Sequence, residues 1–132
     1  MTVDEAIREM QGKSKLTGRA TIDYAQKQLA EGEKVFAAAS ANIQSHHGNF
    51  PGLFVFTDQR LLAVSGLPGI RRAISLPLTQ LLKCKSRKTP LSYTISVSSG
   101  TDGFSAMLSP ETGEKFAPYI SALENAVNKR YS

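Results

Sequence analysis

The spacing of the hydrophobic residues changes at Gly32. Before this glycine they recur at helical spacing, as Ile22 and Leu29 do on one face of a predicted helix. We expect this helix to span residues 21–31, with Gly32 as its left-handed C-cap, after an earlier helix that ends near Gly12. Neither helix is very hydrophobic, so both need a surface to cover, either on this chain or on a neighbouring subunit.

After Gly32 the helical spacing gives way to short runs that are typical of strands, and several of these runs alternate apolar and polar residues with a period of two. The clearest alternation covers residues 91–98, where every second side chain is apolar. Turn-forming residues separate the strands, among them Asp58 and Gln59 in a tight hairpin. We expect seven strands, at 35–43, 53–57, 60–64, 71–76, 80–87, 91–98 and 104–108. Short strands at this spacing predict a small barrel or a sandwich.

The C-terminal part of the chain predicts an amphipathic helix. Its apolar face consists of Phe116, Ile120, Leu123 and Val127. Pro118 interrupts the pattern because it lacks an N–H group and crowds the preceding turn. Either the helix begins near Gly113 or Glu114, which places Pro118 in the first turn, or it begins at Ser109-Pro110 and kinks at Pro118. We favour the first alternative, because a missing donor is harmless in the first turn.

Three segments, in sequence order, carry a family resemblance. They are LAEGEKV at 29–35, GLFVFTDQRLL at 52–62 and ISLPLTQL at 74–81. Together they resemble bacterial pleckstrin-homology-like (PH-like) domains of the YokE-like kind. The resemblance implies an α+β fold, in which a C-terminal amphipathic helix caps a seven-stranded antiparallel PH-like barrel. Residues 32–132 would form this barrel and its helix, and residues 1–31 an N-terminal helical extension of the same single domain.

The resemblance also implies a non-catalytic binding or scaffold module. Related bacterial domains often self-assemble, so the leading hypothesis is a contact with a partner protein or with further copies of the chain. Within the signature that includes Gly52, the side-chain oxygens of Thr57 and Asp58 are expected to hold the tight turn. Arg60 is expected to bond backbone carbonyls or a carboxylate across the hairpin, with Asp58 as the first candidate for the carboxylate. All these residues are therefore expected to have a structural role.

Composition is compatible with one globular domain. The chain has 132 residues, of which 41% are hydrophobic and 20% charged, which is enough to build a core. Cys84 is the single cysteine, so no internal disulfide can form. No run of residues is apolar enough to span a membrane, and the first ten lack the apolar segment of a signal peptide. We therefore expect a cytoplasmic protein.

Positive charge is concentrated in the middle of the chain, where residues 59–101 contain no Asp or Glu. The basic residues of this stretch are Arg60, Arg71, Arg72, Lys83, Lys85, Arg87 and Lys88. In a chain with a net charge of +5, a surface of one sign attracts anions. The alternative is that these side chains are solvated and protect the edges of the sheet from pairing.

A second hypothesis is peripheral binding to an anionic membrane at its inner face. Leu67 and Ile70 are expected to be exposed beside Arg71 and Arg72, so that apolar tips enter the interface while these arginines and the basic cluster at 83–88 meet headgroups. Alternatively, Leu67 and Ile70 close over the barrel or pack on a neighbouring subunit. The predicted first hairpin loop contains no Lys or Arg, so the phosphoinositide specificity of eukaryotic PH domains is not expected.

Nucleic-acid binding is the least favoured of the three hypotheses. The basic stretch has charges that suit phosphates. However, Tyr93 and Phe104 are the only aromatic residues near it, and they form no evident stacking platform.

Reactive residues form no recognisable catalytic or metal-binding set. The chain lacks the G-x-S-x-G, H-E-x-x-H, P-loop and G-x-G-x-x-G motifs. His46 and His47 are adjacent in a predicted turn, where we expect a solvated hairpin tip. Cys84 lies between Lys83 and Lys85, which would point to the opposite face of a strand, so we expect an ordinary half-buried thiol. These observations predict no enzymatic activity, no cofactor, no metal and no small-molecule substrate.

Overall fold

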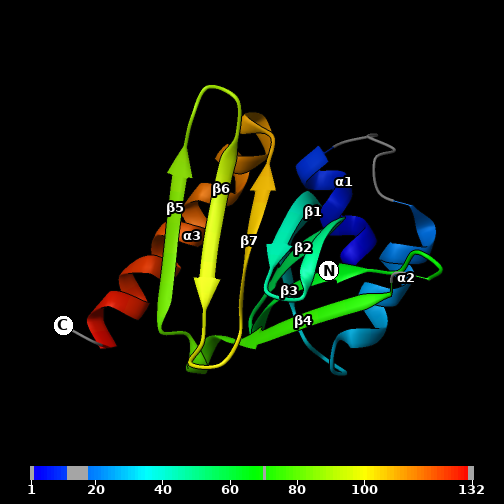
Figure 1. Cartoon of the computed structure of the whole chain (residues 1–132), viewed down its shortest axis with the longest axis horizontal. Coiled ribbons are helices and arrows are strands. Elements are labelled where there is room, and N and C mark those ends of the chain that lie inside the picture. Colours follow the sequence, from blue (N-terminus) through cyan, green and yellow to red (C-terminus); the bar gives the residue numbers. More distant parts are fainter. Residues whose placement is uncertain (1, 12–17, 70, 131–132) are drawn as a thin grey trace.

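The computed structural model of the chain describes residues 2–11, 18–69 and 71–130. Within these residues the elements are α1 (Val3–Gln11), α2 (Arg19–Gln28), β1 (Val35–Ser45), β2 (Gly48–Thr57), β3 (Arg60–Ser65), β4 (Arg72–Pro77), the short 3₁₀ helix η1 (Leu78–Gln80), β5 (Lys83–Lys88), β6 (Tyr93–Ser98), β7 (Gly103–Leu108) and α3 (Pro110–Arg130). The seven strands form one antiparallel sheet in the order β4-β3-β2-β1-β7-β6-β5 (Figure 1). The α+β class and the strand number expected from the sequence are confirmed. None of the described helices combines the length and hydrophobicity that crossing a bilayer requires.

The two N-terminal helices cover the outer face of β1, β2 and β3 (Figure 1). Ile7 of α1 and Ile22 of α2 belong to one buried cluster with Leu53, Val55 and Leu62 of the sheet. Since the inner faces of the same strands line the main core, β2 and β3 are buried on both sides. This double burial explains why they are continuous apolar runs rather than alternating ones. The helices therefore pack on their own sheet, which answers the question that the sequence left open.

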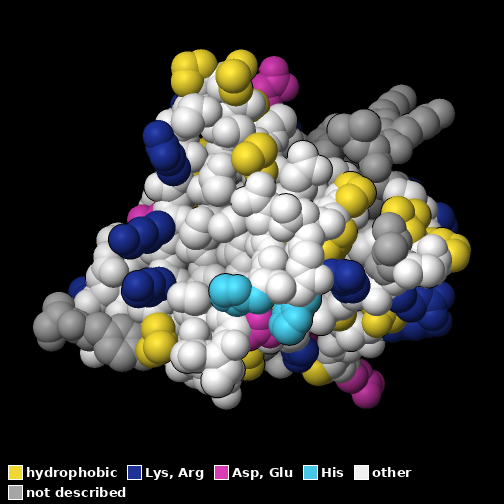
Figure 2. Space-filling view, in the orientation of Figure 1, with side chains coloured by type: hydrophobic (Ala, Val, Ile, Leu, Met, Phe, Trp, Pro, Cys, Tyr) yellow, Lys and Arg dark blue, Asp and Glu magenta, His cyan; other side chains and the backbone are white. Residues whose placement is uncertain are grey.

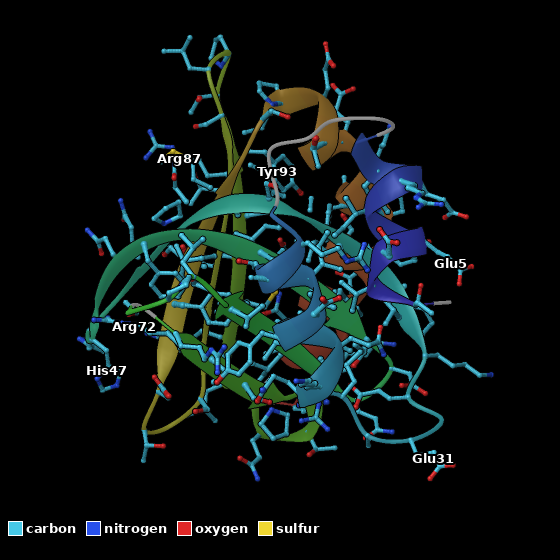
Figure 3. The ribbon with its side chains drawn as sticks, turned by 90° about the vertical axis from the view of Figure 1, so that its right-hand side faces the viewer. Glu5, Glu31, His47, Arg72, Arg87 and Tyr93 are labelled. Carbon is cyan, nitrogen blue, oxygen red and sulfur yellow. The ribbon has the colours of Figure 1, made fainter. Side chains whose placement is uncertain are left out.

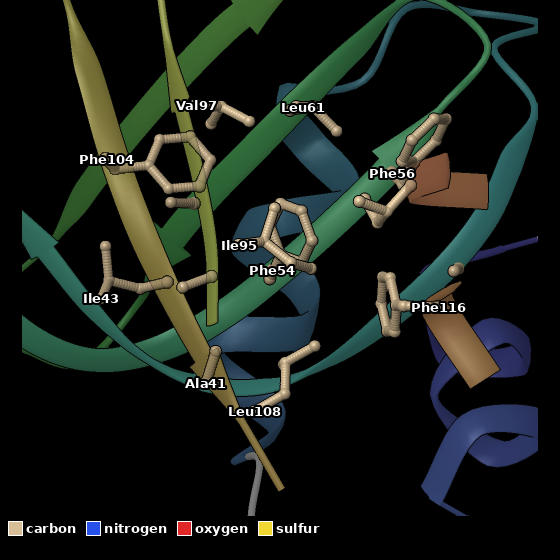
Figure 4. Close-up of a cluster of buried hydrophobic side chains, with 14 of the residues drawn as sticks. Ala41, Ile43, Phe54, Phe56, Leu61, Ile95, Val97, Phe104, Leu108 and Phe116 are labelled. Atoms are coloured by element: carbon tan, nitrogen blue, oxygen red, sulfur yellow. The ribbon is translucent and has the colours of Figure 1, made fainter. Parts of the chain in front are cut away.

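The main core lies between α3 and the inner face of the curved sheet. Phe54 of β2 is at its centre, with its ring centroid 5.4 Å from that of Phe116 in α3 and 5.8 Å from that of Phe104 in β7 (Figure 4). Phe54, Phe116 and Ile120 are fully buried. Small alanine side chains of β1 line the same core. All seven strands and α3 thus contribute to a single cluster of apolar residues.

The C-terminal helix α3 begins at Pro110, so the favoured start near Gly113 or Glu114 is wrong. Just before it, Ser109 Oγ accepts a hydrogen bond at 3.3 Å from the N–H group three residues later, as N-cap side chains do. Pro110 occupies the first helical position, where its missing donor is not needed. Pro118 lies inside the helix. Capping at the start and packing of the apolar face of α3 therefore outweigh the cost of an interior proline.

Other boundaries differ because of local turn structure. α2 ends at Gln28 with Leu29 as its C-cap, whereas Gly32 has a φ of +80° in the turn before β1. The first hairpin is tighter than expected, since β1 and β2 pair as far as Ser45 and Gly48 and leave two residues between them. β4, β5 and β6 each begin later than expected, and η1 occupies residues 78–80 ahead of β5.

The packing of α3 on β6 depends on Gly113, which is buried. A Cβ atom at this position would overlap the Cβ atom and ring of Tyr93. We expect Gly113→Ala to lower the free energy of unfolding by about 1–3 kcal/mol in urea denaturation, although alanine is the better helix former. Gly100→Ala is the matched control, since its new Cβ would meet only Leu82 Cδ1 at 3.8 Å. Equal stability of the two variants would contradict the proposed overlap.

Candidate functional site

The outer face of β5, β6 and β7, which α1 and α2 do not cover, carries mostly polar side chains. Strand pairing places the outward residues of β5, β6, β7 and the end of β1 in rows across the sheet. One row consists of Lys85, Ser96, Ser105 and Gln44, and the next consists of Arg87, Thr94, Met107 and Asn42. We call these eight residues, together with Lys83 and Ser98, the polar face. α1 and α2 cover the other half of the sheet and leave this face to solvent (Figures 1 and 2).

The basic residues of β5 are divided between two faces of the sheet. Because side chains alternate along a strand, Lys83, Lys85 and Arg87 point outward onto the polar face. Lys88 points to α3, where its Nζ atom lies 2.6 Å from a carboxylate oxygen of Glu114. This hydrogen bond and the charge of Lys88 lower the pKa of Glu114. In the parts of the chain that the structure describes, Lys83, Lys85 and Arg87 have no ion-pair partner.

The arginines of the loop expected to contact a membrane are held by their own chain. The guanidinium of Arg71 lies 5.3 Å from the centre of the Tyr24 ring of α2. That of Arg72 lies 5.9 Å from the Phe50 ring and donates a hydrogen bond to the carbonyl of His47 (Figure 3). Cation–π contacts at exposed sites contribute about 0.5–1 kcal/mol each. These contacts make the two arginines less available for a ligand than the three outward cations of β5.

The polar face is hollowed beside the β1–β2 hairpin. This main groove has a volume of about 460 Å³, with Gln44 and Asn49 on the hairpin side and Lys83 and Lys85 on the other. None of the described residues that line it is acidic. Figure 2 shows Lys and Arg side chains along the left of this face, His side chains nearer its centre, and a mainly uncharged surface between them. The nearest turn contains Asp102, whose carboxylate accepts a hydrogen bond from a backbone N–H at 2.8 Å.

Two further depressions continue the main groove toward α2. The first, of about 300 Å³, shares Gln44 and Asn49 with the main groove. The second, of about 430 Å³, shares Met107 with the first and reaches Leu67. We call the three together the extended groove. Leu67 is 39% exposed, so its side chain is neither fully solvent-exposed nor buried over the core. Ile70 lies outside the described residues.

Of the two side chains expected to hold the β2–β3 hairpin, that of Thr57 does so, whereas that of Asp58 bonds outside the turn. Thr57 Oγ1 accepts hydrogen bonds from the N–H groups of Gln59 at 3.1 Å and Arg60 at 3.0 Å. Asp58 joins the hairpin to the segment before β1, because its carboxylate accepts the N–H of Lys34 at 3.0 Å while its own N–H donates to the Lys34 carbonyl at 2.9 Å. The role of both side chains is therefore structural.

Arg60 pairs with Glu33, so the expected pairing with Asp58 is wrong. Its Nε atom donates to Glu33 Oε2 at 3.0 Å, and its second terminal nitrogen lies 3.0 Å from Oε1. Thr57 Oγ1 donates to the same carboxylate, which is fully buried. The carboxylate of Asp58 is instead occupied by a backbone N–H. The last signature residue, Gly52, permits a close approach, since a Cβ atom there would meet a backbone carbonyl of β3 and the Phe50 ring.

The His pair lies at a hairpin tip as the sequence predicts, whereas Cys84 is more deeply buried than the half-buried thiol expected. Cys84 is buried, and this burial, with a smaller contribution from the Glu124 carboxylate, raises the pKa of its thiol to about 12. The thiol therefore stays protonated and is a poor nucleophile. His46 and His47 are exposed at the hairpin tip. No group of three His, Cys, Asp or Glu in the described residues could hold a metal ion.

Two features of this surface differ from the sequence-based prediction. Gln44 and Asn49 lie between the predicted strands 35–43 and 53–57, but they pair across the β1–β2 hairpin and so form one wall of the groove. Leu91 lies in the predicted strand 91–98, but in the structure it lies in the β5–β6 turn and is 89% exposed. Its N–H donates to Thr89 Oγ1 at 3.3 Å. The Thr89-Pro90 pair was the available signal for that turn.

Comparisons with known proteins address the fold. No protein-family model matches the sequence, and neither does any curated protein. Among solved structures, the chain is similar to one described as the Vps36 N-terminal PH domain, with a TM-score of 0.53 and 18% identity over 76% of this chain and 83% of that chain. At this identity the likeness shows the fold alone. The PH-like fold expected from the sequence is therefore confirmed, and membership of the bacterial YokE-like family stays a prediction.

Proposed function

We propose that this chain is a PH-like binding module whose main groove receives an acidic segment of a partner protein. The observation that carries the proposal is the pair Lys83 and Lys85. Both are exposed, neither has an ion-pair partner among the described residues, and no acidic residue lines the groove between them and the hairpin. Cations that line a cleft raise the local concentration of anions and steer their approach.

The shape and lining of the groove favour a protein segment over other anions. A single exposed ion pair contributes only about 0.2–1 kcal/mol, so stable binding needs several contacts. Ser96, Ser98 and Ser105 at the floor supply hydroxyl groups that suit a peptide backbone as well as carboxylates. The segments that resemble YokE-like domains support the same proposal, because those domains are non-catalytic modules.

A second copy of the chain is one partner with this chemistry. Figure 3 places Glu5 and Glu31 on the opposite side of the molecule from Arg72, His47 and Arg87. Contacts between the side of one copy that carries Glu5 and Glu31 and the polar face of another copy would join molecules head to tail. Sedimentation of the chain alone identifies this case. The parent chain would then form species larger than the monomer, and charge reversal at the groove would return it to the monomer.

Charge reversal in the groove is the direct test of the proposal. With a labelled poly-glutamate peptide as the probe, we expect the double variant Lys83→Glu/Lys85→Glu to weaken binding roughly tenfold or more in fluorescence anisotropy. The matched control Lys27→Glu/Lys34→Glu makes the same change in net charge at exposed lysines outside the groove. Equal weakening in both variants would leave only general charge attraction and would overturn the proposed site.

Peripheral binding to an anionic membrane is the second candidate, and one observation favours it. Leu91 is 89% exposed at the tip of the β5–β6 hairpin, which extends beyond the neighbouring strands in Figure 1. An apolar tip with cations behind it suits insertion between anionic headgroups. The membrane contact would then be this hairpin rather than the loop that contains Arg71 and Arg72. Co-sedimentation of a Leu91→Asp variant with phosphatidylglycerol vesicles separates this candidate from the first.

A further inference from the structure

The extended groove changes its chemical character along its length. At the β5 end, Lys83 and Lys85 provide positive charge. At the α2 end, the lining includes Leu67 and Met107, which are 39% and 38% exposed. The large apolar side chains exposed in the described residues are Leu67, Leu82, Leu91, Met107 and Tyr119. Two of these five line the same depression, so exposed apolar surface is gathered at this end of the groove.

The middle of the extended groove is lined by amide side chains. Gln44 and Asn49 belong both to the main groove and to the next depression, and Asn42 belongs to the two depressions nearer α2. None of the three side chains is hydrogen-bonded to another described residue, so their donors and acceptors are available. Amide groups of this kind pair well with the N–H and C=O groups of an extended peptide.

We propose that the extended groove binds an extended peptide segment that carries an acidic residue at one end and a large apolar residue at the other. This inference rests on the proposed function and adds the apolar half of the recognition. The acidic residue meets Lys83 and Lys85, the backbone crosses the amide side chains, and the apolar residue covers Met107 and Leu67. Covering the two apolar side chains removes their surface from water, which adds affinity that charge alone does not supply.

The geometry of the sheet sets the spacing between the two recognised residues. Lys85 and Met107 lie two strands apart and two residues apart along the strand direction, as the pairings through Ser96 and Thr94 show. With strands about 4.8 Å apart and a rise of about 3.4 Å per residue, their separation is about 12 Å. An extended peptide covers this distance in about four residues. The acidic and apolar residues of the ligand are thus expected about four positions apart.

Selection from a random peptide display library, with the whole chain as bait, tests this inference. We expect enriched peptides to combine Asp or Glu with a large apolar residue about four positions away. With one such peptide as the probe, Leu67→Ser/Met107→Ser should weaken binding roughly tenfold, because two apolar contacts are lost. The same variant should bind poly-glutamate as the parent does, which also shows that it is folded. Leu82→Ser/Leu91→Ser removes two exposed leucines outside the groove and is the matched control.

The outcomes separate this inference from the proposed function. Enrichment of acidic peptides without any apolar preference would overturn the inference and leave the proposed function standing. Enrichment without an acidic preference would overturn both. Equal loss of binding in the groove variant and in its leucine control would show that the apolar contact lies elsewhere, and would also overturn the inference.

Discussion

Replacing Glu33 with alanine is expected to lower the free energy of unfolding by about 3–5 kcal/mol. The Glu33 side chain is fully buried and accepts hydrogen bonds from Arg60 and Thr57. Its removal leaves the guanidinium of Arg60, which is only 24% exposed, without its carboxylate partner. An uncompensated charge in such a place is costly because desolvation is no longer offset. Urea denaturation followed by circular dichroism measures the effect.

Two variants separate the ion pair from other effects of the substitution. Glu33→Gln keeps the shape and a hydrogen-bond acceptor but removes the charge. Its free energy of unfolding should therefore lie between those of the parent and the alanine variant. Glu31→Ala changes an exposed glutamate two residues earlier and should leave stability within about 0.5 kcal/mol of the parent. If Glu33→Ala lowered the free energy of unfolding no more than Glu31→Ala, the ion pair between Glu33 and Arg60 would not stabilise the fold.

Phe54→Ala is expected to lower the free energy of unfolding by about 3–5 kcal/mol, because it leaves a cavity at the centre of the main core. Phe54 has no exposed surface, and its ring contacts those of Phe104 and Phe116. Edge-to-face and stacked ring pairs of this kind add to the loss beyond the buried area alone. The ring also links β2 to both β7 and α3, so the cavity affects both sides of the core (Figure 4). Urea denaturation again gives the value.

Phe54→Leu fills part of the same space and should recover a large share of the lost stability. Leu91→Ala is the surface control, since Leu91 is 89% exposed and should change stability by less than about 0.5 kcal/mol. A loss of under about 1 kcal/mol for Phe54→Ala would mean that the core collapses around the missing ring and that these ring contacts contribute little.

Much of the fold is predictable because its signals are local. The alternation at 91–98, the tight Asp58-Gln59 turn and the change of period at Gly32 each depend on neighbours in the sequence. The errors have non-local causes. The start of α3 depends on capping at Ser109 and on packing against the sheet, and the partner of Arg60 is Glu33, which lies 27 residues away. Local preference cannot rank such contacts against one another.

The candidate site is less predictable than the fold. The sequence indicates a basic, acid-free stretch and names Lys83, Lys85, Arg87 and Lys88 as one cluster. Strand alternation then divides that cluster, because Lys88 turns to α3 and pairs with Glu114. The other wall of the groove comes from the β1–β2 hairpin, which is far from β5 in the sequence. Its contribution depends on how the sheet curves.

By itself, the sequence determined the α+β class, the number of strands, the structural role of the Thr57-Asp58 turn and the concentration of positive charge in the middle of the chain. These properties follow from residue type and short-range periodicity. Only the tertiary structure decided which cations stay free, which half of the sheet the N-terminal helices cover, and where charged and apolar side chains share one groove. Each of these depends on contacts between strands and helices that are far apart in the sequence, and short-range periodicity does not predict such contacts.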